Sequence, residues 1–373
     1  MDPKLLILLS YVLAWMIIGG YCGLRCRKDE KARLVFNPLL FMLRLSRNLS
    51  WLDRIASFRW IIAYSTIGLG LLAYAAIEFY GISLRSLLQR ILEPSKATAP
   101  FAPLVPGITI SVETFFYLLP GLSIAIIVHE LSHALAAKAE KLPINSVGLV
   151  VFLALIPGAF VEISEEALRS TRLISRLRVY SAGVAANLIL ALAILVLALN
   201  PLMASGVYAA IIDVEPNSTA ERAGIIPGSL ILGINGSAIH GINDVTRILG
   251  NVSKRTTFII TLYRDGEHYS VTVTKEPNKK IGILIVDVPK ALTDVVDPIT
   301  AYIIHQVLLL TFMINYALAV INAAPLFITD GAKALDSLLE AKWGKKGKEA
   351  SRAIQLLTLF LLLLNINISR PLG

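Results

Sequence analysis

Residues 115–139 read FFYLLPGLSIAIIVHELSHALAAKA, and this stretch decides both the fold class and the expected chemistry. Its apolar length matches the roughly 20 residues that a helix needs to cross the hydrocarbon core of a bilayer. Inside it lies the motif HELSH, with histidines at His129 and His133. Side chains four residues apart share one face of a helix, so both imidazoles can reach one zinc ion. Glu130 lies about 100° further round the helix and can approach a water molecule at an open zinc position.

The apolar surroundings of the motif strengthen the functional interpretation. Histidine and glutamate side chains are costly inside a membrane span, and they indicate function by default. The alternative is a set of polar residues that hydrogen-bond to neighbouring helices, but such packing does not require this spacing. The sequence therefore predicts a zinc site on a membrane helix.

Composition supports a membrane protein. Hydrophobic residues make up 55% of the 373 residues, charged residues only 16%, and the mean hydropathy is +0.69. Soluble proteins have about 25% charged residues. The net charge of +9 is compatible with nucleic-acid binding or with a cytoplasmic excess of Lys and Arg beside membrane spans. The basic residues cluster beside apolar runs, which favours the second interpretation and predicts no nucleic-acid partner.

The apolar runs predict an α-helical polytopic membrane protein with about six transmembrane helices. They lie at roughly 4–24, 60–80, 115–137, 179–200, 299–323 and 350–369. Placing the basic clusters in the cytoplasm puts the N-terminus outside and the zinc site toward the cytoplasmic side of a multi-pass cell-membrane protein. A seventh stretch, 144–163, is interrupted by Pro157 and Gly158 and has cytoplasmic charge on both sides. We expect it to be re-entrant; if it spans instead, every later segment is inverted.

Residues 205–286 differ from the rest, because short β-branched runs alternate with Gly, Pro and Asn turns. Arg264-Asp265-Gly266 lies between two alternating runs and predicts a hairpin. This segment is expected to be a soluble, mostly β insert on the extracytoplasmic side.

A tetrahedral catalytic zinc needs a third protein ligand and one open position. Asn322-Ala-Ala-Pro325 is followed by Asp330-Gly331, and Asp330 is the only acid at the end of an uncharged stretch from Ala301. Pro325 ends the helix and Gly331 is expected to let the chain turn. Asp330 is the best candidate ligand; the alternative is a carboxylate that caps a helix or a turn.

The two motifs, together with Gly183-Val-Ala-Ala-Asn187 between them, resemble the site-2 protease family of intramembrane metalloproteases over roughly residues 101–340. Residues 205–286 look like the PDZ domain that many members carry as an insert. The expected domains are an N-terminal transmembrane pair with an amphipathic linker, a first catalytic half, a PDZ-like domain, and a second catalytic half with a C-terminal helix. They cover 1–100, 101–203, 204–290 and 291–373.

The resemblance also implies roles. His129, His133 and Asp330 would bind one Zn2+ per chain, and Glu130 would be the general base. Asn187 and Asn322, with Pro325 beside the latter, would contact the substrate backbone or help to polarise the scissile carbonyl. The stretch around 147–160 would offer a β-edge to an unwound substrate. The expected substrates are single-span membrane proteins in the lipid bilayer, already shortened by an upstream site-1-type protease.

Two other functions remain open from the sequence. Intramembrane His, Glu and Asp can line the path of a membrane metal-ion transporter, although no internal repeat of spans is visible. The chain could also be a catalytically idle scaffold that binds tails through the insert, against which the intact Glu130 argues.

Overall fold

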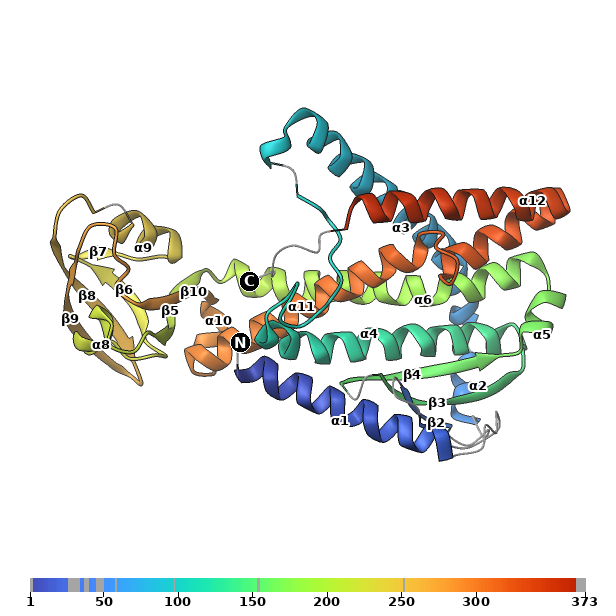
Figure 1. Cartoon of the computed structure of the whole chain (residues 1–373), viewed down its shortest axis with the longest axis horizontal. Helices are drawn as coiled ribbons and strands as arrows, with labels where there is room; N and C mark the ends of the chain where they lie inside the picture. The colour runs from blue at the N-terminus through green and yellow to red at the C-terminus, as the bar shows by residue number, and fades with distance from the viewer. Residues whose placement is uncertain are drawn as a thin grey trace. The chain divides into compact units, whose positions relative to one another are not determined.

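The computed structural model describes residues 3–25, 34–36, 40–44, 50–57, 59–96, 98–152, 155–250 and 252–366. The chain divides into two compact units. The helical unit comprises Met1–Leu192 and Leu310–Gly373, and the β unit comprises Ala193–Leu309. Each is described separately (Figure 1).

Helices make up most of the helical unit. They are α1 (Pro3–Arg25), α2 (Ser50–Ala56), α3 (Arg59–Leu92), a 3-10 turn (Pro94–Lys96), α4 (Val112–Ala139), α5 (Glu165–Ser170), α6 (Leu173–Ile194), α11 (Pro298–Ala323) and α12 (Asp330–Leu364). Helices α6 and α11 continue into the β unit.

Four helices in the described part of the chain are long and apolar enough to cross a membrane. These are Arg59–Leu92, Val112–Ala139, Leu173–Ala204 and Pro298–Ala323, and they coincide with four predicted spans. Helix α1 covers the first predicted span, and the apolar stretch found among its described residues is Leu9–Tyr21. Helix α12 covers the last predicted span as far as Leu364, and residues 367–369 lie outside the described residues. The total of six stays a prediction.

The stretch at 144–163 is a β-hairpin rather than an apolar helix. Four antiparallel strands form a sheet in the order β1-β2-β3-β4. Their bounds are β1 (Leu34–Phe36), β2 (Leu40–Arg44), β3 (Ile144–Phe152) and β4 (Ile156–Ile163). Because Ile144 pairs with Ile163, the two ends of the segment lie side by side, which favours the re-entrant prediction over a single crossing. Strands β1 and β2 were not predicted.

Strand β4 lies against helix α4, as Figure 1 shows. A Cβ at Gly158 would be 2.9 Å from Cγ2 of Ile126, so the missing side chain allows the close approach. On α4, Ser111 caps the first turn by accepting the N–H of Thr114 at 3.0 Å. The hairpin is therefore fixed along the helix that carries the HELSH motif.

The chain between α11 and α12 brings Asp330 to the beginning of a helix. Helix α11 ends at Ala323, and Pro325 follows, as the sequence predicts. Gly331, however, does not serve to turn the chain, because it lies in the first turn of α12. A Cβ there would be 1.9 Å from the carbonyl oxygen of Ala323, so glycine is required by the close approach of two backbones. Further along, Gly344 has non-helical dihedrals (φ 55, ψ −131) and divides α12 into two segments.

The β unit contains an antiparallel sheet in the order β10-β5-β6-β8-β9, with β7 paired to β6. Its elements are a π-helical turn (Leu195–Leu199), α7 (Asn200–Ala204), β5 (Val207–Val214), α8 (Thr219–Arg222), β6 (Leu230–Ile234), β7 (Ser237–Ala238), α9 (Ile242–Leu249), β8 (Thr256–Arg264), β9 (Glu267–Lys275), β10 (Ile283–Pro289) and α10 (Lys290–Thr293). Ile211, Ile231 and Ile260 are fully buried in its core. The predicted β insert and its hairpin are confirmed: Asp265 and Gly266, both with positive φ, join β8 to β9.

Candidate active site

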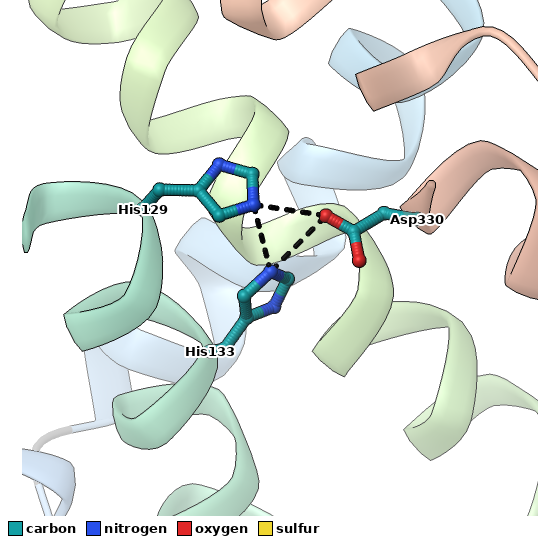
Figure 2. Close-up of side chains that lie close together, drawn as sticks. All are labelled: His129, His133 and Asp330. Atoms are coloured by element: carbon teal, nitrogen blue, oxygen red, sulfur yellow. Dashed lines mark hydrogen bonds and ion pairs between the residues drawn. The ribbon is translucent and has the colours of Figure 1, made fainter. Parts of the chain in front are cut away.

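Three side chains from two distant parts of the chain converge on one point (Figure 2). Helix α4 presents His129 and His133, whose Nε2 atoms are 3.1 Å apart. Oδ2 of Asp330, the first residue of α12, lies 3.0 Å from Nε2 of His129 and 3.1 Å from Nε2 of His133. Asp330 is only 5% exposed. The two histidines therefore lie on one face of α4, and Asp330 reaches both of them from the beginning of α12.

These donor atoms suit a metal ion. Zinc bonds to imidazole nitrogen and carboxylate oxygen are about 2.0–2.2 Å long, so tetrahedral ligand atoms lie about 3.3 Å apart. The observed separations of 3.0–3.1 Å are within a few tenths of an ångström of that value. Within the described residues, His129, His133 and Asp330 form the one group of three or more such side chains that could hold a metal ion. Two imidazoles and one carboxylate leave a fourth position open, as a catalytic site requires.

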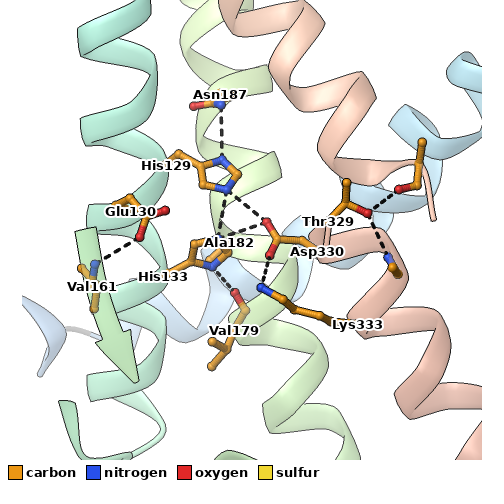
Figure 3. Close-up of polar contacts among 12 residues, drawn as sticks. His129, Glu130, His133, Val161, Val179, Ala182, Asn187, Thr329, Asp330 and Lys333 are labelled. Atoms are coloured by element: carbon orange, nitrogen blue, oxygen red, sulfur yellow. Dashed lines mark hydrogen bonds and ion pairs between the residues drawn. The ribbon is translucent and has the colours of Figure 1, made fainter. Parts of the chain in front are cut away.

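Helix α6 lies directly behind the two imidazoles (Figure 3). Nδ1 of His133 is 2.7 Å from the carbonyl oxygen of Val179, and Nδ1 of His129 is 3.3 Å from Nδ2 of Asn187. Between these contacts lies Gly183, where a Cβ would be 2.5 Å from Nε2 of His133 and 2.6 Å from Nε2 of His129. A glycine is therefore required at this position for the imidazole nitrogens to meet.

Asp330 is held by the residues around the beginning of α12. The hydroxyl of Thr329 accepts the N–H groups of Leu326 and Ala332 at 3.1 and 3.3 Å and donates to the carbonyl of Ala324 at 2.6 Å. This N-cap fixes the turn that carries the carboxylate, and a helix N-terminus favours a negative charge. Lys333, three residues on, places Nζ 3.7 Å from Oδ1 of Asp330, which leaves Oδ2 directed at the histidines.

Glu130 points away from the histidines and toward the hairpin. Its Oε2 accepts the backbone N–H of Val161 on β4 at 3.2 Å (Figure 3). The candidate base is thus attached to an edge strand of the four-stranded sheet.

A cavity of about 720 Å³ joins these groups. Its lining includes the two histidines, Glu130, Asn322 and Asp330, and it continues past charged side chains that are compatible with water. These are Glu162, Glu165, Arg169 and Lys333.

Glu162 at the end of β4 ties the hairpin to the neighbouring strand. It accepts hydrogen bonds from Ser146 on β3 and, at 3.1 Å, from the guanidinium of Arg44 on β2. The Ser146 hydroxyl and then Arg44 hold the pKa of Glu162 below its ordinary value of 4.5. The role of Glu162 in the hairpin depends on strand β2, which the sequence did not predict.

The other expected site residues have different positions. Asn322 lines the cavity, whereas Asn187 is fully buried beside His129 and Pro325 is buried in the connection between α11 and α12. The sequence did not predict a role for Val161, because its backbone N–H makes the contact and any residue except proline has that group. It also missed Lys333, although its spacing of three residues from Asp330 places it on the same helix face.

Comparison with known proteins finds several similar sequences. The chain is 25% identical to "Uncharacterized protein MJ0971" of Methanocaldococcus jannaschii over 375 residues, covering 97% of this chain and 93% of that protein. It is 27% identical over 229 residues to the "Membrane-bound transcription factor site-2 protease homolog" of Arabidopsis thaliana, covering 59% of this chain and 40% of the plant protein. A 66-residue segment, 18% of this chain, is 33% identical to 14% of a probable periplasmic serine endoprotease DegP-like of Halomonas elongata.

The family description "Peptidase family M50" matches residues 117–366, which contain the HELSH motif, the whole β unit and Asp330. This match covers about two thirds of the sequence. The chain therefore belongs to peptidase family M50, the site-2 protease family of membrane metallopeptidases.

Proposed function

We propose that this protein is an intramembrane zinc metalloprotease that hydrolyses peptide bonds within or near the transmembrane segments of single-span membrane proteins. One observation carries the proposal: Nε2 of His129, Nε2 of His133 and Oδ2 of Asp330 meet within 3.1 Å in a cavity that Glu130 also lines. The two histidines lie on the apolar helix α4, and Asp330 follows the apolar helix α11 after a short loop.

The residues divide the work of hydrolysis. Zinc bound by the two histidines and Asp330 would act as a Lewis acid, which would polarise the scissile carbonyl and make a bound water more acidic. Glu130 takes a proton from the attacking water as its oxygen bonds to the carbonyl carbon. As the C–N bond breaks, Glu130 returns the proton to the leaving amine nitrogen. Asn322 lines the same cavity, which supports a role for this side chain in contacting the substrate backbone.

The substrate is proposed to bind along β4 as an added strand. A transmembrane helix satisfies its own backbone and must unwind before attack, so its freed N–H and C=O groups need new partners. Alternate residues of β4 direct their backbone groups away from β3. The hydrogen bond from Val161 to Glu130 indicates that the backbone groups of Val161 face away from β3. Because this direction repeats every second residue along a strand, the backbone groups of Ala159 and Pro157 face the same way. A proline at position 157 is compatible with this direction, because proline is tolerated in a strand where no N–H is needed for pairing with the neighbouring strand, here β3.

The β unit is proposed to be a PDZ domain on the extracytoplasmic side that selects substrates shortened by an upstream protease. Two features support this. Strand β10 lies at one edge of its sheet, and α9 contacts it. An exposed strand edge beside a short helix is suited to receiving a peptide tail by strand addition. The basic clusters beside the spans support a cytoplasmic position for the zinc site.

The test is cleavage of a single-span test protein by the purified chain in liposomes. We expect cleavage to stop with a zinc chelator and to return when zinc is added back. Glu130→Gln should keep zinc but reduce cleavage by at least about 100-fold, the lower range for loss of a general base. Glu113→Gln, an identical substitution in the first turn of the same helix, should cleave normally.

The same liposomes test the rival function. Zinc entry into sealed vesicles without cleavage of the test protein would favour a metal-ion transporter and contradict the proposal. Cleavage by Glu130→Gln at the wild-type rate would show that the general base is wrongly assigned.

A further inference from the structure

The side chain of Asn187 is fully buried, yet only half of its amide has a partner. Nδ2 is 3.3 Å from Nδ1 of His129. Oδ1 has no hydrogen-bond partner among the described residues. A buried amide oxygen without a donor costs free energy, on the order of 1–3 kcal/mol, and calls for an explanation.

The tautomer of His129 supplies that explanation. The Nε2 atoms of both histidines face Asp330, so Nε2 is the atom that would bind zinc. A neutral imidazole that binds a metal through Nε2 carries its hydrogen on Nδ1, and that N–H needs an acceptor. His133 has one at 2.7 Å, the carbonyl of Val179. In the described part of the chain, Nδ1 of His129 has only the Asn187 amide as a partner, and that amide presents its own N–H donor.

A half turn of the amide about its Cβ–Cγ bond exchanges Nδ2 and Oδ1 and places an acceptor against Nδ1 of His129. In the present orientation Oδ1 has no partner among the described residues, so turning the amide sacrifices no hydrogen bond of Oδ1. The imidazole therefore decides between them, because an N–H facing an N–H is repulsive and an N–H facing an oxygen is a hydrogen bond.

We propose that Asn187 is a positioning residue for zinc: its Oδ1 accepts the Nδ1–H of His129 and fixes the tautomer in which Nε2 can bind the metal. The inference rests on the zinc site of the proposed function. It differs from the substrate role that the family resemblance implies for this residue. Asn187 has no exposed surface and is not part of the cavity lining, so the histidine lies between it and any substrate.

The same helix serves both ligands in this arrangement. Val179 and Asn187 are eight residues apart on α6, about two turns, with Gly183 midway. The two acceptors therefore lie on one face, and the glycine between them removes the side chain that would separate them from the imidazoles.

The experiment measures zinc affinity of the full-length, detergent-solubilised chain by competition with a chromophoric chelator. His133→Ala, which removes a ligand, sets the level for loss of the site. We expect Asn187→Leu, of similar volume but without the acceptor, to bind zinc 10- to 100-fold more weakly, as is usual when the partner of a metal-bound histidine is removed. Asn187→Asp, which keeps an acceptor and has no donor, should bind zinc at least as tightly as the wild type.

Asn315→Leu is the matched control. Asn315 is also fully buried in an apolar helix, and its Oδ1 also has no partner within the described residues, but its Nδ2 bonds to the carbonyl of Thr311. Its substitution should leave zinc affinity unchanged.

Three results would overturn the inference: unchanged affinity in Asn187→Leu, equal weakening in Asn315→Leu, or weaker binding in Asn187→Asp. The last is decisive even if Asn187→Leu does not fold, since it would mean that the donor rather than the acceptor matters. A wild-type chain that binds no zinc would instead contradict the proposed function itself.

Discussion

The backbone N–H of Val161 donates a 3.2 Å hydrogen bond to Oε2 of Glu130, so the edge strand β4 and the proposed general base are directly joined. The bond is charge-assisted if the carboxylate is ionised, and such bonds are the stronger kind. It gives Glu130 a fixed orientation from an element other than its own helix.

Removing that N–H should impair cleavage. In Val161→Pro the backbone loses a donor that faces away from β3, so strand pairing is retained. A hydrogen bond to a charged group contributes about 1.5–3 kcal/mol, so we expect kcat/KM to fall by about 10- to 100-fold. Val161→Ala keeps the N–H and is the control. Equal activity of the two variants, measured on the same single-span test protein, would mean that the bond has no role.

A side chain at Gly183 should abolish the metal site. The added Cβ of Gly183→Ala would lie 2.5–2.6 Å from the two Nε2 atoms, so an imidazole must move by about 1 Å. A displacement of that size can reduce the rate about 100-fold, and bound zinc should fall in parallel. Gly70→Ala is the matched control, because Gly70 is a helical glycine on α3 whose Cβ would meet nothing within 4 Å. Full zinc content in Gly183→Ala, by elemental analysis, would contradict the close packing of α6 on the histidines.

Loss of the Thr329 hydroxyl should loosen Asp330. Thr329→Val keeps the shape of the side chain but removes the three hydrogen bonds of the cap, which should cost about 1–2 kcal/mol of stability. Thr329→Ser should retain most of it. Thermal unfolding in detergent gives the stability, and chelator competition shows whether zinc affinity falls with it. A valine variant as stable as the serine variant would rule out the cap as the anchor of this turn.

The hairpin should become less firmly held in acid. The pKa of Glu162 is lowered in the folded chain, so the charged carboxylate stabilises the fold. That contribution is fully present above the ordinary value of 4.5 and is lost as the pH falls through the lower folded-state value. Glu162→Gln should therefore be less stable than the wild type at neutral pH, and the difference should vanish in acid.

The expected size of that difference is below about 1 kcal/mol, because the pair with Arg44 is partly exposed. Adding Arg44→Met to Glu162→Gln should cost less than the two single losses combined. Strictly additive losses would mean that the two side chains do not interact.

The local parts of the site could be predicted from the sequence. His129 and His133 meet because a helix repeats every 3.6 residues, which needs no knowledge of the fold. Asp330 could only be proposed, because its position depends on the turn after α11 and on the packing of that turn against α4 and α6. The contact between Asn187 and His129 depends on the rotation of α6 about its axis, which residue type does not reveal.

The parts that escaped prediction depend on distant pairing. Strands β1 and β2 are short, and the partner of β2 is β3, about a hundred residues further along the chain. Nothing in the local sequence near 34–44 marks it as a strand without that partner. Gly331 was interpreted as a turn residue because turning is the commonest reason for glycine, whereas here the carbonyl of Ala323 occupies the space.

Strand β2 has a consequence for how a substrate is oriented. It covers one side of β3, so the hairpin has a single open side, and that side carries the bond to Glu130. An unwound polypeptide that pairs with this sheet at β4 can do so only next to the carboxylate. Without the N-terminal strands the hairpin would be two-sided, and half of the pairing events would hold the polypeptide away from the reacting groups.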